Sequence, residues 1–238
     1  MSTYAQILLF SFIIPLIFSF HPKIKFYLKW KNFFISNLLV AIPFIIWDII
    51  FTKNKVWDFS DNHISDVTIY NLPIEEVLFF IIIPYCCIFT YHVIKKFTKD
   101  FNVNKQSIYI GTLFFAIAIL IIGIYNIEFM YTSTTLIALG IVLIIISVSK
   151  QKFLLTFYLT FILITCIPFI IVNGLLTGLC ESSINTATVT YNDNERAFSR
   201  FLSIPIEDFF YSMLLLITNT WIYELINRQS SIKETNPS

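Results

Sequence analysis

The sequence predicts an all-α, polytopic membrane protein with seven transmembrane helices. Of its 238 residues, 57% are hydrophobic and 13% are charged, whereas about a quarter of the residues of a soluble domain are charged. Apolar runs long enough to cross about 30 Å of hydrocarbon recur along the chain. Lysine and arginine concentrate in alternate loops, as expected for a chain that crosses a bilayer several times. We therefore expect this chain to be embedded in a lipid bilayer.

The apolar runs number seven, and the fifth is the shortest. No basic stretch precedes the first run and no small-residue cleavage site precedes His21, so we interpret this run as a retained helix, not as a removable signal peptide. The predicted spans are residues 4–20, 33–52, 74–94, 108–125, 135–148, 153–173 and 204–226.

The basic residues predict the orientation. Twelve of the sixteen lysines and arginines fall on one side, which the positive-inside rule makes cytoplasmic. We predict a multi-pass protein of the inner (cytoplasmic) membrane with its N-terminus outside and its C-terminus in the cytoplasm, which requires an odd number of spans. The twelve residues are Lys23, Lys25, Lys29, Lys31, Lys95, Lys96, Lys99, Lys105, Lys150, Lys152, Arg228 and Lys233, and the other four are Lys53, Lys55, Arg196 and Arg200.

Residue types that hold metals, nucleotides or disulfides are scattered. The three histidines lack metal-ligand spacing with cysteines or carboxylates, and three of the four cysteines fall within apolar spans. The five glycines form neither a G-x-G-x-x-G nor a P-loop pattern, and no soluble stretch is long enough for a βαβ unit. We predict no metal, no cofactor such as a flavin, and no nucleic-acid partner.

An internal repeat organises the chain. Residues 42–48 read Ile-Pro-Phe-Ile-Ile-Trp-Asp and residues 167–173 read Ile-Pro-Phe-Ile-Ile-Val-Asn. After a polar loop in each half, residues 73–76 read Pro-Ile-Glu-Glu and residues 205–208 read Pro-Ile-Glu-Asp. The same two motifs in the same order indicate two copies of one unit.

The repeat predicts a 3+1+3 organisation with parallel units. Because each unit has an odd number of helices, an extra span is needed for the second unit to enter the membrane in the same direction as the first. We predict a first three-helix repeat at residues 1–97, a connector helix at 98–130, and a second repeat with a short cytoplasmic tail at 131–238. Sites are expected where such units meet.

Four acidic residues, Glu75, Glu76, Glu207 and Asp208, stand at the starts of the third and seventh spans. Proline at the first helical position and acids in the first turn are ordinary helix-start signals, so capping alone could account for them. Paired acids in both copies, each followed by aromatic residues at helical spacing, favour a functional role. Asp48 lies inside the second span, where an ionisable side chain is costly and counts as a functional hypothesis.

These motifs, together with Trp47-Asp48 and residues 57–59 (Trp-Asp-Phe), resemble the non-flavin lycopene cyclases, which include heterodimeric bacterial and fused archaeal and fungal forms. The resemblance covers both halves and implies the fused form, in which linear ψ end groups of lycopene become β rings. The second half departs from the pattern, since Val172-Asn173 replaces Trp47-Asp48 and Asp208 replaces the second glutamate. Equal catalysis by both halves is therefore not expected.

The resemblance implies an intramolecular lyase or isomerase of the lycopene β-cyclase kind, which acts on a hydrophobic carotenoid and associates with other enzymes of the carotenoid pathway. Cyclisation needs a proton donor, a stabilised carbocation and a proton acceptor, with no redox change. Acids and aromatic faces in a dry site meet these needs. The implied catalytic residues are Glu75, Glu76, Glu207, Asp208 and Asp48, and the implied residues that stabilise the cation or bind substrate are Trp47, Phe79, Phe80, Phe210 and Tyr211.

Two other classes stay open. A small proton-coupled transporter can also be 3+1+3, and Pro43 and Pro168 at matched positions are typical of its interrupted helices. A prenyl transferase would need an aspartate cluster for Mg²⁺ and diphosphate, for which Asp58, Asp61 and Asp66 are candidates on the predicted outer side. A retinal receptor is excluded, because the last span contains no lysine for a Schiff base.

Overall fold

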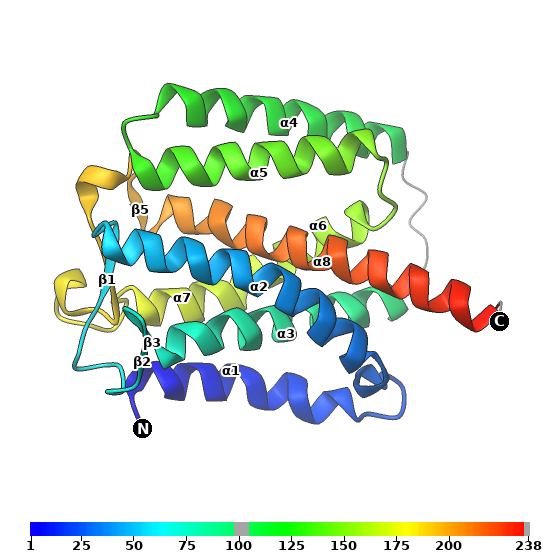
Figure 1. Ribbon diagram of the computed structural model, residues 1–238, viewed down its shortest axis with the longest axis horizontal. Coiled ribbons are helices and arrows are strands. Elements are labelled where there is room, and N and C mark those ends of the chain that lie inside the picture. The colour runs from blue at the N-terminus through cyan, green and yellow to red at the C-terminus, as the bar shows by residue number, and fades with distance from the viewer. Residues whose placement is uncertain (98–104, 236–238) are drawn as a thin grey trace.

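The computed structural model describes residues 1–97 and 105–235, which fold mainly into helices (Figure 1). Lys99 and the predicted boundary between the first repeat and the connector lie outside the described residues. The α-helices are α1 (Thr3–Ser19), α2 (Trp30–Lys53), α3 (Ile74–Phe97), α4 (Lys105–Tyr125), α5 (Met130–Val148), α6 (Leu154–Ile164), α7 (Ile170–Leu176) and α8 (Ile206–Thr235).

The helices match the predicted spans. Among the described residues, six helical stretches are long and apolar enough to cross a membrane: 26–53, 74–97, 105–125, 130–148, 154–176 and 206–230. The first predicted span forms α1, which is apolar but has only 17 residues. The all-α membrane class is therefore confirmed, whereas the count of seven spans and the orientation stay predictions.

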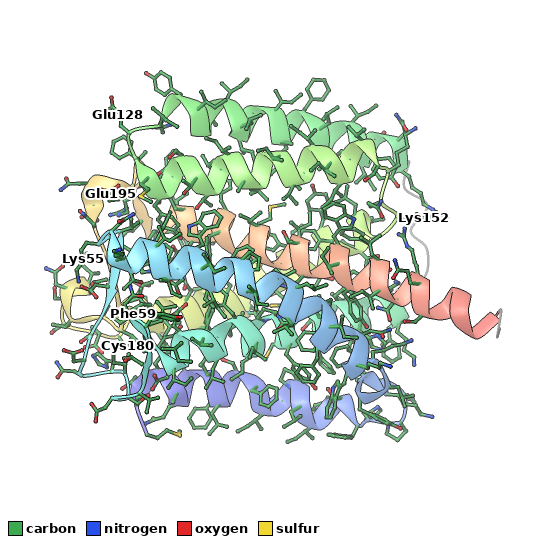
Figure 2. All side chains as sticks on the ribbon, viewed as in Figure 1. Lys55, Phe59, Glu128, Lys152, Cys180 and Glu195 are labelled. Atoms are coloured by element: carbon green, nitrogen blue, oxygen red, sulfur yellow. The ribbon has the colours of Figure 1, made fainter. Side chains whose placement is uncertain are left out.

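Successive helices run back and forth between the two ends of the bundle (Figure 1). The N-terminus and the strands lie at one end, which we call the hairpin end, and the C-terminus lies at the other. Figure 2 places Lys55, Glu128, Cys180 and Glu195 at the hairpin end and Lys152 at the opposite end. The loops that carry most of the basic residues thus lie away from the strands, as the alternation predicts.

Three small antiparallel pairs of strands close the hairpin end. Strands β2 and β3 form a hairpin directly before α3, and β5 and β6 form one directly before α8. Strands β1 and β4 lie about 130 residues apart and pair with each other, so the polar loops of the two halves are joined. The strands are β1 (Trp57–Phe59), β2 (Thr68–Ile69), β3 (Leu72–Pro73), β4 (Val189–Tyr191), β5 (Arg200–Phe201) and β6 (Ile204–Pro205).

The two halves share local geometry. The hairpin turns contain Tyr70 and Leu202, both with left-handed backbone (φ 57° and 58°), at positions 132 residues apart. The same offset relates Glu75 to Glu207. The halves differ in the helix with the Pro-Phe-Ile-Ile motif: α2 is continuous through Pro43, whereas a π-helical turn at Thr165–Phe169 separates α6 from α7. These shared features support the predicted repeat.

The connector helix α4 packs against α5 at one edge of the bundle (Figure 1). Small residues permit the close approach, because a Cβ added at Gly140 would lie 3.0 Å from the Leu120 Cβ and 3.1 Å from the Ala116 carbonyl oxygen. The core of the bundle lies between α2, α3, α5 and α8, where Phe80, Leu139 and Ile217 are fully buried. This packing fixes the starts of α3 and α8 side by side at the hairpin end.

Candidate active site

The first acid of each pair holds its hairpin. The Glu75 carboxylate accepts hydrogen bonds from the Ser65 backbone N–H (2.9 Å) and the Ser2 hydroxyl (2.5 Å). Glu207 likewise accepts from the Phe198 backbone N–H (2.9 Å) and the Thr132 hydroxyl (2.7 Å). Both carboxylates therefore tie the loop before a hairpin to the first turn of the helix after it.

The second acid of the first pair points into the protein. The Glu76 carboxylate accepts a hydrogen bond from the Tyr4 hydroxyl at 2.5 Å, and its neighbour in the interior is the carboxyl group of Asp48. Asp48 accepts a hydrogen bond from Trp57 Nε1 at 2.5 Å. Its second oxygen, Oδ2, is buried and has no hydrogen-bond partner among the described residues.

The second acid of the other pair is surrounded by donors. Asp208 accepts hydrogen bonds from the Tyr131 hydroxyl (2.6 Å), the Asn173 side-chain amide (2.6 Å) and the Tyr191 hydroxyl (2.9 Å). Burial and the negative charge of Asp208 raise the pKa of Tyr191 well above its usual value, so this phenol keeps its proton and remains a donor. Three donors stabilise the charged form of the Asp208 carboxylate.

Aromatic rings fill the space between these two acid clusters. The Tyr131 ring lies 5.2 Å from Trp57, 5.9 Å from Tyr191 and 6.2 Å from Tyr211, measured between ring centroids. Trp57 lies 6.0 Å from Tyr211. The four rings come from α5, α8 and the paired strands β1 and β4, so both halves contribute to one aromatic cluster.

The two acid clusters and the aromatic cluster stand at one end of a cavity of about 750 Å³. Helices α1, α3, α7 and α8 form its walls, and β1 and β4 close it at the hairpin end. Its carboxyl groups are Glu76 and Asp208 at the aromatic end and Glu181 in the loop after α7. Most of the remaining lining is apolar, and among the described residues no lysine or arginine lines it.

Comparison with known proteins bears on the classes that the sequence left open. The sequence model described as lycopene cyclase matches residues 1–94 and 128–226, which is most of the chain. The chain belongs to the lycopene cyclase family. The unmatched stretch between the two segments contains α4, which is the predicted connector. Membership favours a cyclase over the transporter.

Two curated relatives of this protein come from fungi. A bifunctional lycopene cyclase/phytoene synthase from Leptosphaeria maculans is 32% identical over 58 residues, and one from Aspergillus oryzae is 28% identical over 69 residues. The matches cover 24% and 29% of this chain but 10% and 12% of the relatives, so the chain spans a small part of their length. No solved structure matches the chain.

Of the ten site residues predicted from the sequence, four line the cavity of this family member. They are Glu76, Asp208, Phe79 and Tyr211. Asp48 does not line the cavity but is the neighbour of Glu76. The others, Glu75, Glu207, Trp47, Phe80 and Phe210, lie outside the cavity lining. The catalytic roles of all ten stay predictions.

Tyr4, Tyr131 and Tyr191 were not predicted as site residues from the sequence, and Trp57 was part of the family resemblance only. Tyr4 and Tyr131 are equivalent in the structure, where each is the second residue of its helix, α1 or α5, but Tyr131 lies before the predicted fifth span. No local sequence signal marked Tyr191, since it reaches the site through the pairing of β4 with β1.

Among residues 1–97 and 105–235, no three His, Cys, Asp or Glu side chains converge to hold a metal ion. Asp58, a candidate for a diphosphate site, forms an exposed ion pair with Lys55 at 2.6 Å.

Proposed function

We propose that this protein cyclises the linear ψ end groups of lycopene to β-type rings by acid-initiated, non-redox carbocation chemistry. The observation that carries the proposal is the cavity, in which Glu76 and Asp208 stand at one end of an apolar space, with aromatic rings between them. A hydrocarbon substrate fits this lining, and the two acids supply the proton donor and acceptor that cyclisation needs.

In the first step, Glu76 donates a proton to the terminal double bond of the substrate. Asp48 and Glu76 are buried neighbours, and two such carboxyl groups do not both hold a negative charge, so the pair retains a proton. The buried Asp48 Oδ2 atom, which has no hydrogen-bond partner among the described residues, supports a retained proton, because a proton shared with Glu76 would give this oxygen a partner. The Tyr4 hydroxyl and Trp57 Nε1 then stabilise the negative charge that remains on the pair.

In the second step, the tertiary carbocation is attacked by the neighbouring double bond and the six-membered ring closes. Faces of Trp57, Tyr131 and Tyr211 offer negative potential without a nucleophile that would trap the cation. Each such contact contributes about 2 kcal/mol when desolvated. Tyr131 and Tyr191 donate hydrogen bonds from their hydroxyl groups to Asp208.

In the third step, Asp208 removes a proton from the new ring and leaves a ring double bond. One proton is gained and one is lost, so the product is an isomer of the substrate and no flavin or nicotinamide takes part. The three donors to Asp208 stabilise its carboxylate form, and the cation provides the driving force for proton transfer.

The test is conversion of lycopene by membranes that contain this protein, with no added cofactor. Chromatography should separate a monocyclic or bicyclic carotene from lycopene. In D₂O, mass spectrometry should find one deuteron in each new ring, because the added proton comes from an exchangeable carboxyl group. Unchanged lycopene, with well-expressed protein in the membrane, would count against the proposal. A cyclic product without deuterium would reject the acid-initiated mechanism.

A further inference from the structure

The cavity opens sideways, between α1 and α7. On its lining, Phe10 and Ile14 of α1 are 69% and 63% exposed, and Ile171 of α7 is 52% exposed. The π-helical turn at Thr165–Phe169 belongs to the same wall and contributes Pro168 and Phe169 to the lining. Insertions of this kind in a helix frequently accompany functional sites.

The cavity is also long. Its lining on α3 extends from Glu76 to Thr90, which is about 20 Å along the helix at 1.5 Å per residue. Its lining on α1 extends from Thr3 to Pro15. A narrow apolar space of this length, with the acids at one end and no lysine or arginine among the described lining residues, fits a linear hydrocarbon chain and does not fit a diphosphate or a fatty-acid head group.

A second, shallower depression of about 520 Å³ lies between α2 and α5. Its α2 residues are each 125 positions before a residue that lines the cavity, as Pro43 is before Pro168. Its α5 residues are each 127 positions after a residue of α1 that lines the cavity, as Ala138 is after Ser11. The depression is therefore the counterpart of the sideways opening in the other half of the repeat.

The two openings differ in the side chains at their floors. Where the cavity has Val172 and Leu176, the depression has Trp47 and Phe51, whose rings meet edge to face at 5.6 Å. Trp47 also packs against Tyr211 at 5.8 Å. None of the residues that line the depression is acidic, and Trp47 and Phe51 are its largest side chains.

We propose that the opening between α1 and α7, here named the α1–α7 portal, admits linear isoprenoid hydrocarbons sideways from the bilayer, and that Trp47 and Phe51 plug the equivalent passage between α2 and α5. The inference rests on the proposed function for the identity of its occupant. It assigns Trp47 a role in closing one half, in place of contact with the reacting cation.

The test measures binding without turnover. Lycopene is achiral and shows no circular dichroism in lipid, so a visible dichroism band reports lycopene held in the protein. The Glu76→Gln protein in phosphatidylcholine nanodiscs loaded with lycopene provides the reference. Adding Val172→Trp or Ser11→Trp should reduce the band roughly ten-fold, because either side chain overpacks the portal. The matched control is Ala138→Trp, at the counterpart of Ser11, and it should keep the band within about two-fold.

The outcomes separate this inference from the proposed function. A band that survives both Val172→Trp and Ser11→Trp, in proteins that remain monodisperse, overturns the portal even if lycopene is cyclised. If Ala138→Trp reduces the dichroism band as much as Val172→Trp and Ser11→Trp do, the inference that only the α1–α7 side is open is overturned. A reference band that only the portal variants abolish supports the portal, whether or not the unmodified protein cyclises lycopene.

Discussion

Replacing Glu76 with glutamine, with Glu75→Gln as its matched control, separates catalysis from helix capping at adjacent positions of one helix. Glutamine keeps the shape of the side chain and its ability to accept a hydrogen bond from Tyr4, but it cannot deliver a proton. Loss of a general acid lowers the rate by about 10²–10⁴-fold, or about 3–5 kcal/mol of transition-state stabilisation. We expect the Glu76→Gln protein to fold normally and to lose activity by that factor.

The control predicts a different loss. At Glu75, the amide oxygen of glutamine can still accept from the Ser65 backbone N–H and the Ser2 hydroxyl, so what is removed is the contribution of charge to these hydrogen bonds and of the bond that Oε2 accepts from the Ser65 hydroxyl at 3.2 Å. That contribution is about 0.5–1.5 kcal/mol of folding stability. Activity per folded molecule should stay within a few-fold of the unmodified protein, because the first-turn carboxylate at this position holds the hairpin and does not line the cavity.

The assay is the initial rate of lycopene conversion in membranes, measured by chromatography and normalised to the amount of monodisperse protein extracted. Thermal stability of the purified variants, measured by loss of monodispersity, reports folding separately from rate. Comparable losses of rate in Glu75→Gln and Glu76→Gln, at comparable stability, would refute the division between a hairpin-holding acid and a proton-donating acid.

Three further predictions follow from the same contacts. Tyr131→Phe leaves the buried Asp208 Oδ1 without its 2.6 Å donor, which should cost about 1–3 kcal/mol of stability and lower the rate of lycopene conversion per folded molecule about ten-fold or more. An unchanged rate would remove Asp208 from the mechanism. Gly140→Leu should destabilise the protein by about 1–3 kcal/mol through overpacking against α4, whereas Gly111→Leu, with open space around it, should not, as thermal unfolding in detergent would reveal. Reporter fusions after Lys152 should report cytoplasm and those in the loop at residues 60–64 should report the outside; the reverse result would invert the orientation.

Most of the fold could be predicted from the lengths of the apolar runs and from the repeated motifs. Apolar runs of about 20 residues have few alternatives to helices in a bilayer, so the helix positions followed from the sequence. The β-hairpins before α3 and α8 were not predicted from the sequence, although the Pro-Ile-Glu motifs correctly indicated where these two helices begin. The sequence also did not predict that the two helices with the Ile-Pro-Phe-Ile-Ile motif differ. The motif lies in the continuous helix α2 in the first half, and it overlaps the π-helical turn between α6 and α7 in the second.

The site was predictable to the level of the acid pairs and no further. Adjacent helical residues point about 100° apart, so Glu75 and Glu76 have different surroundings, and packing of the whole bundle decides which of them lines the cavity. Tyr191 belongs to a loop whose position depends on strand pairing across about 130 residues. Long-range pairing of this kind leaves no local pattern in the sequence, which is why the donors around Asp208 were found only in the structure.

The differences between the two repeats give the halves distinct tasks. In the first half, Asp48 lies beside Glu76, and two buried carboxyl groups together retain a proton. In the second half, an amide occupies the matching position, and Asn173 donates to Asp208, which stabilises a carboxylate. In the mechanism that we propose, this one difference, aspartate against asparagine, makes one acid a proton donor and the other a proton acceptor. The residue before each of these positions also differs: it is Trp47 in the first half and Val172 in the second. The first half, which has the carboxyl pair, is therefore also the half whose passage we propose to be filled. A proton donor and a proton acceptor at one end of a single cavity are what one ring closure requires, and two identical halves would not supply them.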